Sequence, residues 1–140
     1  MARLNLSPLA KSLFVSTSSM ESQNERILLI TQNIANAPTK ASSPDDLFRR
    51  KLASFKSVWN GSLGTHILKM QRVIEANDEP LKTYSPGDPR ANEEGYLFQP
   101  NISPALEMAD MREASKSYES SLRAFERVLG MIQNVSGLLK

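Results

Sequence analysis

The chain of 140 residues has no cysteine, one histidine, little net charge and no long apolar run. Without cysteine, disulfide bonds, thiol catalysis and cysteine-ligated metal are excluded. The aliphatic run at residues 27–30 is far shorter than the roughly 18 residues of a membrane-spanning helix. A net charge of +2 is too small to indicate a nucleic-acid or membrane-surface partner. We therefore expect no nucleic-acid binding and no direct membrane insertion.

Residues that could carry chemistry are also scarce. His66 is the only histidine, and no carboxylates surround it at the spacing of metal ligands. The adjacent acids at 78–79 and 93–94 lie in segments typical of turns, where such acids are usually solvated. No phosphate-binding glycine loop or nucleophile motif is present. We expect no enzymatic activity, no catalytic residue, no metal and no cofactor.

The strongest pattern in the sequence is a heptad repeat over residues 103–139. Ser103 and Pro104 form a typical helix start, and no proline follows them. Ser115 and Ser136 occupy two positions of an otherwise apolar stripe. The apolar positions of this predicted seam are Met108, Met111, Tyr118, Leu122, Phe125, Leu129, Ile132 and Leu139. A helix of this length would run about 50 Å, so it requires an equally long partner.

The candidate partner is the N-terminal segment, which starts with a similar pair, Ser7 and Pro8. Its seam keeps the same alternation of four and three residues through Leu6, Ala10, Leu13, Thr17, Met20, Asn24, Ile27, Thr31 and Ile34. Asn24 falls on this seam, where it either specifies the helix register or is a tolerated polar residue on a shallow face. We predict that the two helices form a coiled coil and that both seams serve as assembly interface.

The segment between the helices has a different pattern. Pro38 ends the first helix, and residues 40–46 are typical of a loop. Residues 47–59 fit either a helix or a strand, whereas residues 66–75 predict a strand in a short hairpin, and residues 80–84 begin a second extended piece. A turn at Pro86 and Gly87 and a positive φ at Gly95 precede another extended piece. The predicted fold is mainly α with a small β insertion: helix 1–37, insertion 38–101, helix 102–140.

Three blocks of the sequence resemble the bacterial flagellar axial proteins, the rod and hook family, and most closely its proximal rod members. The first is the Asn-Ile-Ala-Asn-Ala run at 33–37, the second spans residues 84–102, and the third combines Glu107-Met108 with Ala114-x-x-x-Tyr118-Glu119. Asp88 departs from the family pattern, which usually has histidine there. The signature residues are Asn33, Ala35, Asn36, Tyr84, Pro86, Gly87, Pro89, Gly95, Tyr96, Pro100 and Asn101.

This resemblance implies a structural subunit of the proximal rod in the flagellar basal body. It implies export by the flagellar type III apparatus without a cleaved signal peptide, followed by polymerisation in the periplasm. The partners would be other copies of the chain, other rod proteins and the export apparatus. The alternative is a coiled-coil adaptor or export chaperone. As a further hypothesis, the basic cluster of Arg49, Arg50, Lys51 and Lys56 contacts an acidic turn of the next subunit.

Overall fold

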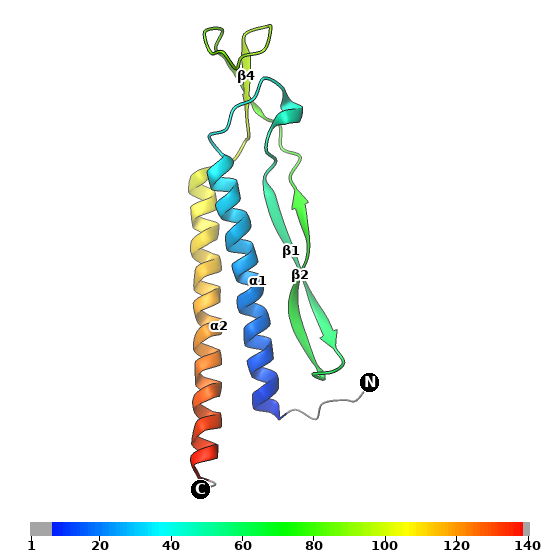
Figure 1. The fold of residues 1–140 in the computed structure, drawn as a ribbon, viewed down its shortest axis with the longest axis vertical. Coiled ribbons are helices and arrows are strands. Elements are labelled where there is room, and N and C mark those ends of the chain that lie inside the picture. The colour runs from blue at the N-terminus through cyan, green and yellow to red at the C-terminus, as the bar shows by residue number, and fades with distance from the viewer. Residues whose placement is uncertain (1–6, 139–140) are drawn as a thin grey trace.

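The computed structural model describes residues 7–138 and shows two long helices with two antiparallel hairpins between them (Figure 1). The fold is therefore mainly α with a small β insertion, as predicted. The helices are α1 (Pro8–Asn36) and α2 (Pro104–Leu138), and the short 3-10 helix η1 spans Pro44–Asp46. The strands are β1 (Lys51–Asn60), β2 (Thr65–Glu75), β3 (Leu81–Tyr84) and β4 (Tyr96–Gln99). Leu6 and Leu139 of the predicted seams lie outside the described residues.

The ends of α1 follow from its sequence. The Ser7 hydroxyl accepts a hydrogen bond from the Ala10 amide at 3.2 Å, and Pro8 occupies the first turn, where no amide is needed. At the other end, Pro38 supplies no backbone amide to continue the helix. Proline likewise begins α2. The predicted helix starts are confirmed.

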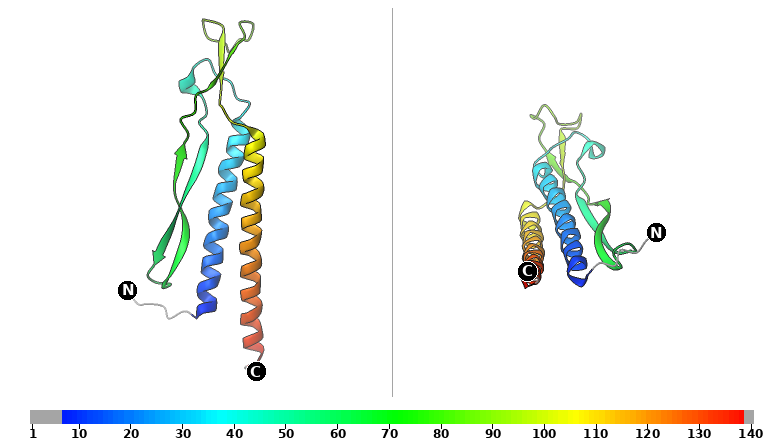
Figure 2. Two further views of the ribbon diagram at one scale, coloured as in Figure 1. Left: turned by 180° about the vertical axis from the view of Figure 1, so that it is seen from behind. Right: turned by 60° about the horizontal axis from the view of Figure 1, so that its bottom comes forward.

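The two helices run antiparallel, and α1 lies between α2 and the long β1–β2 hairpin (Figures 1 and 2). Their contact line repeats every seven residues on each helix. On α1 it includes Ser19, Arg26 and Asn33, which bond to α2. On α2 it includes Glu107, Ala114 and Ser121. Small side chains such as Ala114, which is fully buried, allow the helices to approach closely.

The segment at 47–59, for which the sequence pattern fits either a helix or a strand, is a strand from Lys51 onward and forms the first half of the long hairpin. Pairing runs from Lys51 opposite Glu75 to Asn60 opposite Thr65, and a bulge next to Ser54 leaves Gln71 as the extra residue on β2. Both strands of the hairpin contact α1, and the Ser22 hydroxyl donates a hydrogen bond to the Leu68 carbonyl. Ile67, next to Leu68 on β2, is buried. It thus lies along α1 for much of the helix length (Figure 1).

The second hairpin, β3–β4, forms a small module beyond the ends of the helices (Figure 1). Ala41 bridges to Phe98, and the Gln99 amide donates to the carbonyl of Ala37 at 2.9 Å, so the module is tied to the end of α1. Gly95 has a φ of 81°, as its position before the last strand predicts. A side chain there would meet the ring of Tyr84 at 2.9 Å, so the site requires glycine.

Candidate functional site

A buried polar cluster joins α1, α2 and the root of the β1–β2 hairpin. Asn33 and Glu107 are each only 1% exposed. The Asn33 amide nitrogen donates to the Glu107 carboxylate at 2.9 Å and to the Lys51 carbonyl at 2.9 Å. Its oxygen accepts from the Lys51 amide at 2.8 Å. One side chain therefore caps the start of β1 and also holds the carboxylate of α2.

Arg50 neutralises this buried carboxylate. Its Nε donates to Glu107 Oε1 at 2.6 Å, and its Nη2 lies 2.6 Å from the same oxygen and 3.4 Å from Asp110. Because a buried charge without a partner is very costly, Glu107 requires this guanidinium. We call Asn33, Arg50 and Glu107 the polar node. It forms only when both helices and the hairpin are in place.

The node changes the interpretation of the basic cluster at residues 49–56. Arg50 bonds within the chain, the Arg49 side chain donates to Asn77 at 3.2 Å, and the Lys51 ammonium donates to Gln32 at 3.3 Å. Each of these three residues therefore already has a partner within the chain, and the contact with an acidic turn of the next subunit stays a prediction. Lys56 is exposed.

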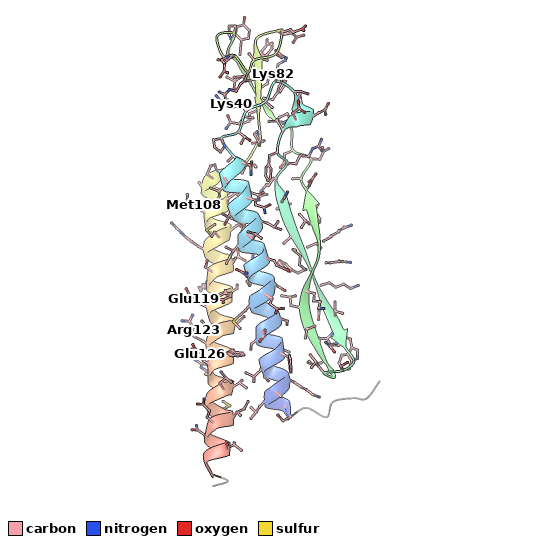
Figure 3. All side chains as sticks on the ribbon, in the orientation of Figure 1. Lys40, Lys82, Met108, Glu119, Arg123 and Glu126 are labelled. Carbon is pink, nitrogen blue, oxygen red and sulfur yellow. The ribbon has the colours of Figure 1, made fainter. Side chains whose placement is uncertain are left out.

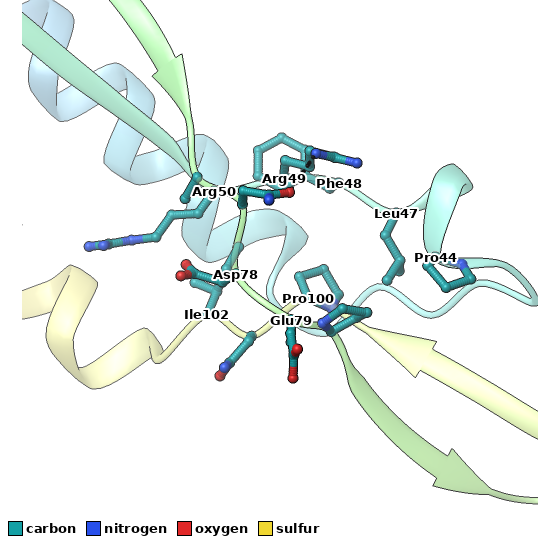
Figure 4. Close-up of a pocket in the computed structure, with 13 residues that line it drawn as sticks. Pro44, Leu47, Phe48, Arg49, Arg50, Asp78, Glu79, Pro100 and Ile102 are labelled. Carbon is teal, nitrogen blue, oxygen red and sulfur yellow. Dashed lines mark hydrogen bonds between the residues drawn. The ribbon is translucent and has the colours of Figure 1, made fainter.

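A cleft of about 190 Å³ lies between the hairpin root and the small β3–β4 module (Figure 4). Arg49, Asp78 and Glu79 all line it, so the basic and acidic groups expected on different subunits share one cleft of a single chain. Pro44, Leu47 and Pro100 supply its apolar walls. Within residues 7–138, no cluster of three histidine or acidic side chains is placed to hold a metal ion, and no helix is long and apolar enough to cross a membrane.

The predicted seams lie beside the helix contact line. On α2, Met108 and Leu122 follow Glu107 and Ser121 by one residue, and Leu129 continues this row. These three side chains are 51%, 36% and 37% exposed. The remaining large apolar residues of the described seams are half-buried: Leu13, Met20, Ile27, Ile34, Met111, Tyr118, Phe125 and Ile132. Asn24 is exposed, so within one chain it does not lie between the helices.

The two seams form one apolar face. In an antiparallel pair, the residue one step after the contact line turns to the same side on both helices. Met20 follows Ser19 on α1, and Leu122 follows Ser121 on α2. Residues one step before the line turn to the other side, and there Gln32 bonds to Lys51 of the hairpin. The seam residues therefore lie on the side of the helix pair away from the hairpin, which we call the open face.

A shallow groove of about 540 Å³ lies along α2 at this face. Met108, Met111 and Ser115 form its floor with the charged Arg112, Lys116 and Glu119 along its length. Figure 3 marks Met108 and Glu119 on α2. Apolar side chains bordered by charged groups are typical of a surface that binds another protein.

The signature residues of the small module build its turns. The rings of Tyr84 and Tyr96 meet edge to face with centroids 5.1 Å apart, and the Lys82 ammonium lies 3.8 Å from the centre of the Tyr96 ring. Two hydrogen bonds from Arg90 lower the pKa of Asp88 to about 2. Pro86, Gly87 and Pro89 are exposed in the loop, whereas Pro100 is buried and Asn101 exposed.

The remaining signature residues belong to the end of α1. The Asn36 side chain donates to the Gln32 carbonyl, and Ala35 is exposed. Asn33 and Glu107 were identified from the sequence as parts of family blocks, but no spacing rule predicted that they bond to each other across 74 residues. The only signal in the sequence is that both residues belong to motifs of the same family, which could have suggested that they act together.

The comparisons with known proteins agree with this architecture. A model described as "Flagellar basal body rod FlgEFG protein C-terminal" matches residues 93–138. The flagellar basal-body rod protein FlgC of Agrobacterium fabrum is 31% identical, over 96% of this chain and 98% of the relative. The proteins of the same name from Bacillus subtilis and Aquifex aeolicus are 31% and 34% identical, over 86% and 81% of this chain and 91% and 84% of theirs. The chain therefore belongs to the family of the flagellar basal-body rod protein FlgC.

Proposed function

We propose that this chain is a non-enzymatic structural subunit of the proximal rod in the flagellar basal body. The observation that carries the proposal is the open face. Both helices place their apolar seams on one side of the pair, and within residues 7–138 Met108, Leu122 and Leu129 remain exposed there. The relatives named as basal-body rod proteins support a role in that assembly.

In this proposal, copies polymerise through their terminal helices, and the open face contributes to coiled-coil packing between neighbouring subunits. Covering the remaining exposed area contributes on the order of 1 kcal/mol per seam side chain. One such contact is weak, so a repeated array supplies the stability. A contact between two different surfaces that does not close on itself generates a filament or a rod.

We further propose that the flagellar type III apparatus exports the chain, without a cleaved signal peptide, to its place in the periplasmic rod. The partners are other copies of the chain, other rod proteins and the export apparatus. The division into two assembly helices and an intervening β insertion belongs to the same proposal. The adaptor or chaperone alternative has no specific observation in its favour.

Leu122→Asp tests the open face, with Met131→Asp as its matched control. Both are exposed apolar residues of α2, but Met131 turns to the other side of the contact line. Leu122 is a better test than the half-buried Phe125, where a charge would also disturb folding. We expect Leu122→Asp to be exported normally but to be absent from purified basal bodies, with loss of motility.

The control should assemble and swim like the wild type. Normal rods in the Leu122→Asp strain would refute the role of the open face. A wild-type chain that remains in the cytoplasm and never appears in basal bodies would instead support the adaptor.

A further inference from the structure

One side of the β1–β2 hairpin carries three exposed positive charges. Lys56 and Lys69 lie directly opposite each other in the strand register, and both are exposed. Arg72, opposite Ser54, falls on the same side of the ribbon. Among residues 7–138, none of these three cations takes part in an ion pair. Like charges directly opposite on a strand pair destabilise it, so the arrangement costs the monomer stability.

Apolar side chains flank these charges. Leu52 and Ile74 form an exposed cross-strand pair towards the hairpin root, and Val58 is exposed towards the tip. Alternation along β1 puts Leu52, Lys56 and Val58 on one side of the strand. We call Leu52, Ile74, Arg72, Lys56, Lys69 and Val58 the basic strip. By the strand register this side of the hairpin also carries Ile67, which lies opposite Val58 and is buried, and none of the paired residues on this side is a carboxylate.

A matching surface of opposite charge lies on α1. Phe14, Glu21 and Leu28 recur every seven residues, so they form one line along the helix, and Glu25 lies one turn from both Glu21 and Leu28. All four are exposed, and within residues 7–138 neither glutamate is in an ion pair. We call these four residues the acidic strip.

The two strips agree in length and order. Phe14 to Leu28 spans fourteen helical residues, about 21 Å. Leu52 to Val58 spans six strand residues, about 20 Å. Both strips place their charges between apolar ends, with Leu28 and Leu52 at the ends nearer the β3–β4 module (Figure 1).

The strips also lie at the same height on the molecule. The Ser22 hydroxyl bonds to the Leu68 carbonyl, which puts the neighbouring Lys69 level with the stretch of α1 that holds Glu21 and Glu25. Lys56, Lys69 and Arg72 are all exposed, so a neighbouring copy can reach them. Two copies side by side, pointing in the same direction with little axial shift, would bring the charges together.

We propose that the basic strip of one copy binds the acidic strip of a second copy of this chain. This inference rests on the proposed function and names one of the lateral contacts of the assembly. The contact joins two different surfaces, so each copy offers a free strip of each kind to the next neighbour, as an open array requires. The charges give the contact its orientation, and the apolar ends are covered on both sides.

The test is a charge exchange in a strain whose own copy is replaced. One variant carries Lys56→Glu and Lys69→Glu, a second carries Glu21→Lys and Glu25→Lys, and a third carries all four changes. The matched control, Lys40→Glu with Arg127→Glu, makes the same change in net charge as the first variant, at exposed positions outside both strips. Far-UV circular dichroism of the purified variants checks that each retains wild-type helicity.

We expect either double variant to be exported, yet to fall roughly tenfold or more in its amount in basal bodies, since attraction becomes repulsion. The fourfold variant should regain assembly and motility, and the control should behave as wild type. Normal assembly of the double variants, or no recovery in the fourfold variant, overturns the proposed contact. Absence of the wild-type chain from basal bodies overturns the proposed function itself, so the two failures are distinguishable.

Discussion

Replacement of Arg50 by methionine would measure what the polar node contributes to stability. Glu107 is 1% exposed, and without Arg50 its carboxylate retains only the Asn33 amide at 2.9 Å. Methionine preserves much of the volume of the arginine stem but supplies no charge. The variant therefore leaves a buried carboxylate without a cation.

Removing one partner of a buried ion pair costs about 3–5 kcal/mol in the free energy of unfolding. The reverse change, Glu107→Leu, should cost only about 1–2 kcal/mol. In that variant Arg50 still reaches Asp110 at 3.4 Å, and Asn33 still donates to the Lys51 carbonyl. The double variant should resemble Glu107→Leu alone, which gives a coupling energy between the two sites equal to the cost of Arg50→Met, about 3–5 kcal/mol.

Urea unfolding followed by circular dichroism at 222 nm, a wavelength that reports helix, measures all three values. With a urea dependence of roughly 1–3 kcal/mol per M, the Arg50→Met midpoint should fall by about 1–5 M. If Arg50→Met unfolds within about 1 kcal/mol of wild type, or if the costs of the two single variants simply add, the carboxylate is not held by the guanidinium as described.

Two further predictions concern the small module. Gly95→Ala should destabilise this module by about 1–3 kcal/mol, because φ is 81° and the added Cβ would meet the Tyr84 ring at 2.9 Å. Gly87→Ala should be nearly neutral, because no atom lies within 4 Å of a Cβ added there. Thermal unfolding of both variants checks this, and equal losses would contradict it. Arg90 lowers the pKa of Asp88 from 3.8 to about 2. The ionised carboxylate therefore contributes to the stability of the folded state above pH 3.8, and this contribution is lost as the pH falls through about 2. Carboxyl NMR titration should give that midpoint, and Arg90→Gln should return it towards 3.8; an unchanged midpoint would exclude Arg90 as the cause.

The helices could be predicted because their signals are local. Ser7 and Pro8 fix one start, Pro104 fixes the other, and Pro38 limits the end of α1. The heptad pattern identifies an apolar side on each helix, but it did not give the line along which the helices touch. Within one chain the closest contacts use small and polar residues such as Ala114 and Ser121, which carry no hydrophobic periodicity.

The hairpin and the node depend on contacts that the sequence does not mark. Residues 47–59 have apolar spacing that suits two structures, and only pairing with β2 decides for a strand. That pairing brings Lys69 beside Lys56. The exposed basic residues of the hairpin therefore form a different set from the cluster at residues 49–56 that the sequence places together. Asn33 and Glu107 are polar residues, which normally indicate a solvated surface, and their burial follows from Arg50 at the hairpin root.

The node also sets the order in which this chain can reach its final state. Its members come from residues 33, 50 and 107, so the last bond must close loops of 57 and 74 residues. Contacts so distant in sequence slow folding, because chain entropy is lost before they form. While the chain is still being synthesised from its N-terminus, Glu107 is not yet present, and Arg50 stays solvated. Completion of the last helix is thus the event that locks the hairpin in place.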